Sequence, residues 1–125
     1  MHLILYQTEW CPYSHRVRQR LTELGLEYAV KPVPVERSER SELMAATGQD
    51  RIPALVLDGG APICGSQAIL AYLSERFDEH PDALKHRAKA SEKVPSFEEL
   101  EARSGEWTKP LRPPSARVGL NTRLA

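Results

Sequence analysis

Short hydrophobic runs alternate with helical spacings along the first 80 residues. The runs at 3–6, 26–30 and 52–57 have the length of buried strands. The first of them is continuous and apolar, which predicts a central strand with both faces buried. The run at 61–63 follows Asp58-Gly59-Gly60, a strong hairpin signal, and predicts a short edge strand.

The spacing after the first run predicts a helix with clear start and stop signals. Pro12 suits the first helical position, because its missing N–H costs nothing there and its φ is already helical. Val17, Leu21 and Leu24 then recur at i, i+4 and i+7, as on one face of a helix. Gly25 supplies the C-terminal stop.

Two further helices are predicted. The charged stretch 36–42 opens one of them, with Leu43 and Met44 facing inward and Gly48 closing it. Ser66 is the predicted N-cap of the other. The apolar stripe of this third helix consists of Ile69, Leu70, Leu73 and Phe77.

The order of these elements is βαβ followed by ββα, which places the chain in the α/β class. The first two strands should form a parallel pair with a right-handed crossover. We expect one domain over 1–80 and an extension over 81–125 that is rich in charge and proline. Within this extension, Ser96 and Glu99 form a capping-box pattern, so a short helix is expected at about 96–105 and largely irregular structure elsewhere.

Composition narrows the classes of function. Lys and Arg number 17, as do Asp and Glu, so no charge imbalance points to nucleic acid. No run approaches the roughly 18 apolar residues of a membrane span, and the first residues lack the pattern of a secretory signal. Two cysteines are too few for a disulfide scaffold or a structural zinc site. We therefore expect a cytoplasmic protein in a reducing compartment, without a metal and without membrane or nucleic-acid partners.

Cys11 lies where the first strand has ended and the first helix begins. A cysteine at this place meets unpaired backbone N–H groups and the positive end of the helix dipole. That field favours the thiolate, which is the nucleophilic form of cysteine. We interpret Cys11 as the catalytic nucleophile. The alternative is an inert buried thiol.

Two other motifs suggest a binding site beside this cysteine. Ile52-Pro53 leads into a strand, and an X-Pro bond is the kind that can be cis. A cis bond would expose the backbone N–H and C=O of Ile52 to a peptide-like ligand. Gly65-Ser66 precedes a helix, where a hydroxyl and free N–H groups suit a carboxylate.

In this order, Cys-Pro-Tyr-Ser, Ile-Pro and Ser-x-Ala-Ile resemble the glutaredoxin and glutathione S-transferase N-terminal domain family. The resemblance covers about residues 1–80 and implies a thioredoxin-like fold with a mixed four-stranded sheet. It also implies that glutathione is the ligand and co-substrate. The glutathione-binding residues expected from it are Pro12, Tyr13, Arg51, Ile52, Pro53, Gly65 and Ser66.

The resemblance assigns each end of glutathione to a part of this chain. Its cysteinyl unit would pair with the backbone of Ile52, and its γ-glutamyl carboxylate would lie at Ser66. The glycyl carboxylate has three candidates, Arg51, Gln49 and Lys31, of which Arg51 is best placed beside Ile52.

Departures from the family pattern favour a particular reaction. Ser14 stands where dithiol relatives have a second cysteine, so Cys11 would act by a monothiol mechanism. Gly65 replaces the glutamate usual in transferases, and the chain after Phe77 is too short for their helical domain. We therefore expect a glutaredoxin-type oxidoreductase that removes glutathione from glutathionylated thiols. The alternatives are a glutathione-binding module without turnover and a transferase fragment that needs a partner.

Some assignments stay open at this level. Cys64 is either a packing residue or a resolving thiol, and His15 is either a base for Cys11 or a solvent-exposed side chain. An iron–sulfur cluster is not expected, because the glutaredoxins that bind one carry Cys-Gly-Phe-Ser instead of Cys-Pro-Tyr-Ser. The expected oligomeric state is a monomer or a weak dimer.

Overall fold

The computed structural model describes residues 2–92, 96, 98–99 and 102. The chain divides into two compact units, Met1–Ser91 and Glu92–Ala125, and each is described by itself. In the second unit, the Ser96 N–H donates to Glu99 Oε2 at 2.8 Å and the Glu99 N–H donates to Ser96 Oγ at 3.1 Å. This reciprocal pair confirms the predicted capping box. Most of the predicted helix at 96–105 lies outside the described residues.

The first unit is built on a mixed four-stranded sheet, as the sequence predicts. Its strands are β1 (Ile4–Gln7), β2 (Ala29–Pro32), β3 (Ala54–Val56) and β4 (Pro62–Cys64), arranged in the order β2-β1-β3-β4. β1 runs parallel to β2, and β3 runs antiparallel to both β1 and β4. β1 therefore has a central position, as expected from its continuous apolar run.

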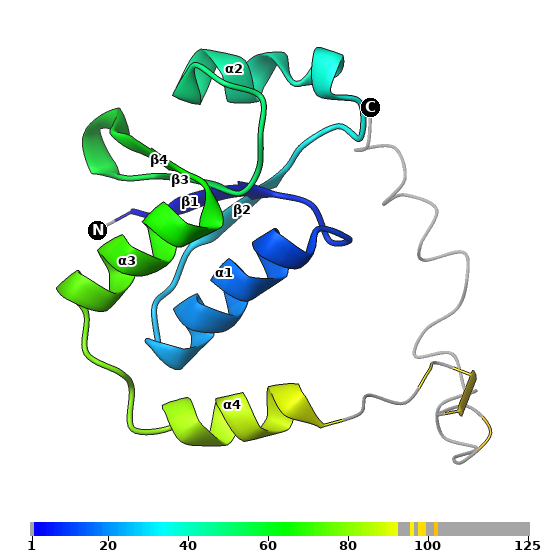
Figure 1. Cartoon of the computed structure of the whole chain (residues 1–125), viewed down its shortest axis with the longest axis vertical. Helices are drawn as coiled ribbons and strands as arrows, with labels where there is room; N and C mark the ends of the chain where they lie inside the picture. The colour runs from blue at the N-terminus through cyan, green and yellow to red at the C-terminus, as the bar shows by residue number, and fades with distance from the viewer. Residues whose placement is uncertain (1, 93–95, 97, 100–101, 103–125) are drawn as a thin grey trace, which may run out of the picture. The chain divides into compact units, whose positions relative to one another are not determined.

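Helices cover both faces of this sheet (Figure 1). α1 and α3 lie on one face, and α2 lies on the other. The helices are α1 (Pro12–Glu23), α2 (Ser41–Thr47), α3 (Ser66–Arg76) and α4 (Ala83–Ser91), with 3₁₀ turns η1 (Arg37–Glu39) and η2 (Asp58–Gly60). This is the α/β thioredoxin-like arrangement.

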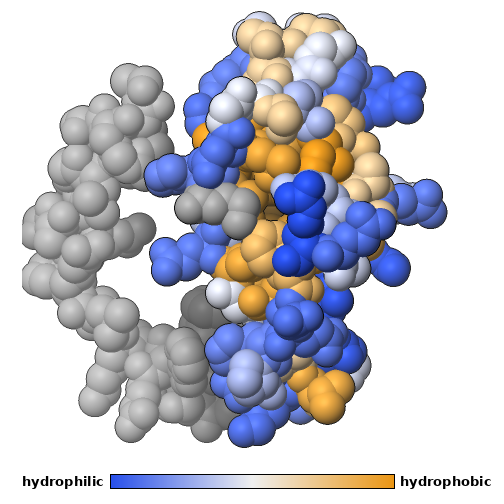
Figure 2. Space-filling view, turned by 90° about the vertical axis from the view of Figure 1, so that its left-hand side faces the viewer, coloured by the Kyte–Doolittle hydropathy of each residue, from blue (hydrophilic) through white to orange (hydrophobic). Residues whose placement is uncertain are grey.

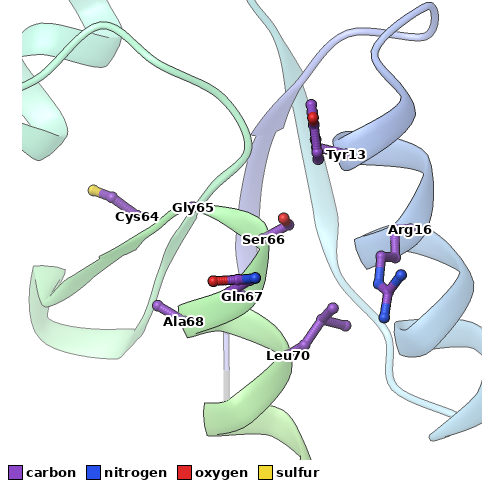
Figure 3. Close-up of a pocket in the computed structure, with 8 residues that line it drawn as sticks. All are labelled: Tyr13, Arg16, Cys64, Gly65, Ser66, Gln67, Ala68 and Leu70. Atoms are coloured by element: carbon purple, nitrogen blue, oxygen red, sulfur yellow. The ribbon is translucent and has the colours of Figure 1, made fainter.

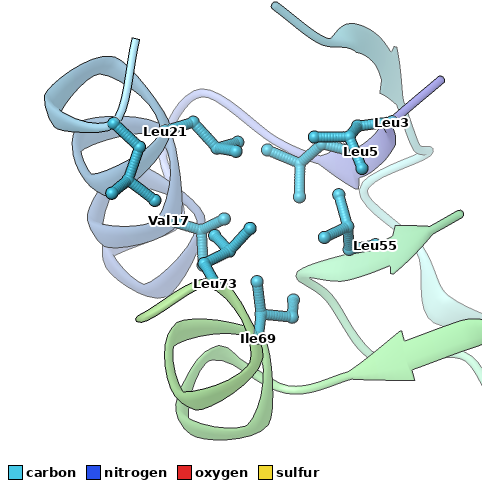
Figure 4. Packing of buried hydrophobic residues seen from close by; sticks show 8 residues of the cluster. Leu3, Leu5, Val17, Leu21, Leu55, Ile69 and Leu73 are labelled. Carbon is cyan, nitrogen blue, oxygen red and sulfur yellow. The ribbon is translucent and has the colours of Figure 1, made fainter. Parts of the chain in front are cut away.

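The main core fills the space between the sheet and the pair α1 and α3 (Figure 4). Its members have almost no exposed surface, and each buried leucine or isoleucine contributes about 1.5–3 kcal/mol by leaving water. Because side chains alternate along a strand, the strand residues between those of the main core face α2 and form a smaller second cluster with it. The main core consists of Leu3, Leu5, Val17, Leu21, Leu24, Leu55, Ile69 and Leu73, and the second cluster of Tyr6, Leu43 and Ala54.

β2 begins at Ala29, three residues later than the predicted start at Leu26. Leu26 instead packs partly buried against the main core. Every residue of β2 is exposed, as fits a strand at the edge of the sheet. An edge strand tolerates proline, so β2 continues through Lys31 and ends at Pro32 itself.

The second predicted helix, expected to open within 36–42 and to close at Gly48, starts later in the structure. That stretch forms η1 and only the first two residues of α2, because Arg40 turns inward between them. The Arg40 guanidinium is buried and donates to the carbonyl groups of Pro34, Val35 and Asp50 at 2.8, 3.1 and 2.9 Å. Leu43 is buried as predicted, whereas Met44 is 47% exposed, so its predicted inward orientation is wrong.

α4 was not predicted, because its apolar residues do not recur at a helical spacing. Only Ala83 of this helix is buried, and Leu84 is 70% exposed. α4 packs on α1 chiefly through charge: Arg87 donates to Glu23 at 2.9 Å and also pairs with Glu79. The compact unit reaches Ser91, while the predicted domain limit at about residue 80 remains a prediction.

Glu23 is the buried centre of this charged group at the C-terminal end of α1. Its carboxylate accepts from Arg87, from Arg20 at 2.9 Å and from Gln19 at 3.1 Å. The hydrogen bond from Arg87, followed by those from Gln19 and Arg20, lowers the pKa of Glu23 to about 2. Glu79 closes the group by accepting from Arg20 at 2.6 Å, so two carboxylates and two guanidinium groups neutralise one another.

Hydrophobic residues come to the surface only in places. Figure 2 shows them gathered in the middle of one face, with hydrophilic residues around them. Within the part of the chain that the structure describes, no helix combines the length and the apolar character needed to cross a membrane.

Candidate functional site

Cys11 is the N-cap of α1. Its sulfur accepts a hydrogen bond from the backbone N–H of Ser14 at 3.4 Å, and its carbonyl accepts from the N–H of His15 at 3.0 Å. Pro12 takes the first helical position, as predicted. The sulfur therefore lies where the first N–H groups of a helix can stabilise a negative charge.

The thiol is covered, but the residues on either side of it are open. Cys11 is only 6% exposed, whereas Trp10 and Tyr13 are 61% and 62% exposed. The aromatic side chains that flank Cys11 in the sequence are therefore accessible to a ligand, whereas the thiol itself is almost covered.

Two buried residues with hydroxyl groups, Thr8 and Ser14, lie within three positions of Cys11 in the sequence. Ser14, one turn further along α1, has no exposed surface. Its hydroxyl and that of the buried Thr8 have no hydrogen-bond partner among the described residues. The second cysteine of the chain, Cys64, is exposed, and both thiols are free.

The arginines of α1 have different roles. The Arg18 guanidinium donates to Gln7 Oε1 and to the Thr8 carbonyl, at 3.3 Å for the latter, and lies 3.7 Å from the Glu9 carboxylate. Arg18 therefore stabilises the loop that leads to Cys11. Arg16 instead lines an open pocket between α1 and α3.

The Ile52–Pro53 peptide bond is cis, as predicted. β3 starts at Ala54, so Ile52 lies just outside the ladder of the sheet. The carbonyl of Pro53 accepts from the Gly65 N–H at 3.0 Å, which connects this loop to the start of α3.

The three candidates for the glycyl carboxylate differ in how far they are already engaged. Lys31 pairs with Glu42 at 2.6 Å, a bond that raises the pKa of Lys31. The Gln49 side chain accepts from the Arg51 N–H at 2.6 Å and donates to the Arg51 carbonyl at 2.9 Å, so it supports the backbone before the cis bond. Arg51 is exposed and, in the described part of the chain, has no carboxylate at ion-pair distance.

Gly65, and not the predicted Ser66, is the N-cap of α3. Its backbone has φ 94° and ψ 143°, a conformation open essentially only to glycine, and this lets the chain turn sharply after β4. Ser66 is consequently the first helical residue. Its hydroxyl and the free N–H groups of the first turn lie together at the end of α3.

An open pocket of about 570 Å³ separates α1 from α3 near this point (Figure 3). Tyr13 and Arg16 form the α1 side, and residues of the first turns of α3 form the other. The side chain of Cys64 points away from Tyr13 and Arg16. The lining residues are Tyr13, Arg16, Cys64, Gly65, Ser66, Gln67, Ala68 and Leu70.

A second depression of about 440 Å³ lies on the other side of Cys64 and Gly65, and Arg51 lines it. Sequence reasoning thus identified residues of both depressions, namely Tyr13, Gly65, Ser66 and Arg51. It missed Gln67, although its place directly after Ser66 in the first turn could have indicated it. Leu70 was assigned to the core and instead lies half-buried at the pocket.

No three His, Cys, Asp or Glu side chains come together to hold a metal ion within the described ranges of the chain. The prediction that the protein has no metal remains a prediction.

Comparisons with known proteins place these features in a family. Residues 5–81 match the family described as "Glutathione S-transferase, N-terminal domain". A zeta-class glutathione S-transferase of Euphorbia esula is 41% identical over 70 residues, which is 54% of this chain and 31% of the relative. Glutaredoxin 3 of Escherichia coli is 28% identical over 54 residues, which is 43% of this chain and 65% of the relative.

Solved structures give the same result. A glutathione transferase family member from Pseudomonas fluorescens Pf-5, crystallised with bound glutathione, aligns with a TM-score of 0.57 and 28% identity. The alignment covers 63% of this chain and 40% of that chain. The chain spans about a third of the length of this zeta-class transferase and of a maleylacetoacetate isomerase of Pseudomonas aeruginosa that it also matches in sequence. This protein belongs to the family of glutathione S-transferase N-terminal domains, which shares its thioredoxin-like fold with the glutaredoxins.

Proposed function

We propose that this protein is a glutathione-dependent thiol–disulfide oxidoreductase of glutaredoxin type that works through Cys11 alone. The observation that carries the proposal is the position of Cys11 at the N-cap of α1, with a backbone N–H already donating to its sulfur. A buried serine one turn later leaves no neighbouring thiol on α1 to complete the reaction.

The reaction is a pair of thiol–disulfide exchanges. The Cys11 thiolate attacks the glutathionyl sulfur of a mixed disulfide, the substrate's S–S bond breaks, and the departing thiolate takes up a proton. A second glutathione, as its thiolate, then attacks the mixed disulfide on Cys11. This forms glutathione disulfide from the incoming glutathione and the glutathionyl group on Cys11 and restores the Cys11 thiolate, so one free glutathione is consumed for each substrate thiol released.

The binding site would hold glutathione along its whole length. Ile52, beside the cis bond and outside the sheet ladder, offers its backbone to the cysteinyl unit. Ser66 and the first N–H groups of α3 suit the γ-glutamyl carboxylate, and Arg51 suits the glycyl carboxylate. Pro12 and the exposed Tyr13 would form the wall next to the sulfur.

The comparisons support glutathione as the ligand, because a similar solved structure contains it and a curated relative is a glutaredoxin. The proposed partners are glutathione and glutathionylated thiols. We further propose that the protein acts without a metal and as a monomer or weak dimer. The free thiols fit a reducing compartment, for which we propose the cytoplasm.

The test is reduction of glutathionylated β-mercaptoethanol, measured as consumption of NADPH in a coupled assay with glutathione reductase. We expect turnover by the wild type and none above background by Cys11→Ser. Cys64→Ser should retain turnover, because the mechanism needs one thiol. Equal rates for the wild type and Cys11→Ser would disprove the proposal.

A second candidate is a glutathione-binding module without turnover, or a transferase fragment that needs a partner. Two observations favour it. Cys11 is only 6% exposed, and the match covers only 31% of the length of the zeta-class transferase. Calorimetry separates the two candidates: glutathione binding to an inactive wild type would support the module. A measured mass larger than one chain would support an assembly.

A further inference from the structure

The pocket between α1 and α3 contains one charged side chain, and that side chain is a cation. Eight residues line it, and among them Arg16 is the only one with a charge. A ligand group at this place would therefore meet a positive charge that no lining carboxylate offsets.

Arg16 differs from the other arginines of α1, because it has no partner in the described part of the chain. Arg18 is engaged by the loop before Cys11, and Arg20 by Glu23 and Glu79. Arg16 is exposed and, among the residues described, makes no ion pair or hydrogen bond. Its guanidinium is thus available to a ligand without breaking an existing interaction.

The opposite wall of the pocket also suits an anion. Ser66 begins α3, an eleven-residue helix whose first N–H groups have no partner within the helix. Gln67, the next lining residue, is neutral. At Gly65 a side chain would meet no atom within 4 Å, so the space beside the helix end is open. A carboxylate here could bind a guanidinium and backbone donors together, whereas an ammonium group would find no anionic partner on the lining.

We propose that Arg16 binds the α-carboxylate of the γ-glutamyl end of glutathione, and that this end of the site does not recognise the α-amino group. The inference rests on the proposed function for the identity of the ligand. It adds a specificity residue, Arg16, and a substrate class: thiol tripeptides with a terminal carboxylate at this end, whether or not an amine accompanies it.

The experiment measures binding of three ligands to the wild-type protein by calorimetry. The reference is S-methylglutathione, which cannot exchange with Cys11. One analogue, S-methyl glutaryl-cysteinyl-glycine, lacks the α-amino group, and another, S-methyl γ-aminobutyryl-cysteinyl-glycine, lacks the α-carboxylate. We expect loss of the amine to change Kd by less than about threefold and loss of the carboxylate to raise it about tenfold or more, as for a hydrogen bond to a charged group.

The variant Arg16→Gln then tests which residue binds the carboxylate. It should weaken S-methylglutathione about tenfold, and removal of the carboxylate should cost little further, because the two changes delete the same interaction. Gln67→Glu, which puts an anion on the lining, should also weaken binding. Lys85→Gln, an exposed lysine on α4, has the same change in net charge and should leave Kd unaltered.

Each outcome has one meaning. If loss of the ligand's α-carboxylate raises Kd by the same factor in Arg16→Gln as in the wild type, Arg16 does not bind the carboxylate and the inference is overturned. A tenfold loss on removing the amine would overturn the second half of the inference and leave the proposed function intact. If S-methylglutathione does not bind the wild type, the glutathione site itself fails, and both proposals fail with it.

Discussion

The two ends of α1 satisfy their polar groups in opposite ways. At the C-terminal end, the buried carboxylate of Glu23 accepts hydrogen bonds from Arg20, Arg87 and Gln19, and the charges balance. At and just before the N-terminal end, the buried hydroxyl groups of Thr8 and Ser14 have no hydrogen-bond partner among the described residues. One helix therefore has a saturated end and an unsaturated end.

This difference separates stability from chemistry. A saturated group of charges resists change and contributes to the folded state, whereas buried polar groups without partners are costly unless a ligand or a reaction uses them. We infer that the C-terminal end of α1 stabilises the unit and that the N-terminal end is kept for function.

Replacing Cys11 with alanine should lower turnover of a glutathionylated thiol to background, at least about a hundredfold, because the nucleophile is lost. The free energy of unfolding should change by less than about 1 kcal/mol, since the hydrogen bond that the sulfur accepts from the Ser14 N–H is weak, at 3.4 Å. Steady-state kinetics and urea unfolding of the same preparation measure both quantities. A large loss of stability would show that Cys11 is a structural residue.

Replacing Glu23 with alanine should have the reverse profile. We expect the free energy of unfolding to fall by about 2–3 kcal/mol, because Arg20 and Arg87 lose their shared buried acceptor. Turnover per folded molecule should be unchanged. Glu27→Ala, at an exposed glutamate just beyond α1, is the matched control and should be neutral in both assays. Equal destabilisation by the two variants would remove the special role of Glu23.

The stability due to Glu23 should depend on pH in a defined direction. Its pKa is about 2 in the folded protein and 4.5 ordinarily, so the unfolded chain binds the proton more readily. The contribution is therefore complete above pH 4.5 and is lost as the pH falls toward 2. In urea titrations, the difference between the wild type and Glu23→Gln should shrink by about 2 kcal/mol over this window. A constant difference would contradict the assignment.

Replacing Ser14 with alanine should stabilise the protein slightly, by about 0.5–1 kcal/mol, because it removes a buried hydroxyl that has no partner. Ser74→Ala, at an exposed position of α3, measures the gain due to helix propensity alone. The gain at Ser14 should exceed the gain at Ser74 in thermal unfolding. A loss of stability at Ser14 would mean that its hydroxyl is bonded in solution.

The parts of the fold set by local rules were predictable from sequence. Pro12 at the first position of α1 and Gly48 at the left-handed C-cap of α2 were identified correctly. So was the cis bond before Pro53. Each of these depends on the conformational limits of proline or glycine, which are properties of the residue itself.

The predictions of local structure were wrong where contacts between residues distant in the sequence determine the conformation. Arg40 belongs to the charged stretch from which a helix was expected, but carbonyl groups of two separate segments, 34–35 and Asp50, bind its guanidinium in the interior. Leu26 looked like the start of a strand and instead packs on the core. α4 carries no hydrophobic stripe. Its Arg87 pairs with Glu23 of α1 and with Glu79, and spacing along the sequence does not reveal these pairs.

The sequence predicted several residues of the candidate site, but it did not predict how they are arranged in space. Cys11, Ile52 and Ser66 were singled out from their motifs, but the pocket wall formed by Arg16 and Gln67 depends on how α1 lies against α3. That packing follows from the main core, and no single motif encodes it.

The docking of α4 has a consequence for ionic strength. This helix buries only Ala83 and is joined to α1 through Arg87, whose side chain is 46% exposed. At 0.1 M salt, where the screening length is about 10 Å, dissolved ions weaken the half-exposed pair between Arg87 and Glu79 more than the pair with the buried Glu23, and they barely affect apolar burial. Salt should therefore release α4 while the sheet and its core remain folded, and amide exchange in α4 should accelerate before exchange in β1. The protein would then respond to its ionic surroundings through one helix, without unfolding the unit that carries Cys11.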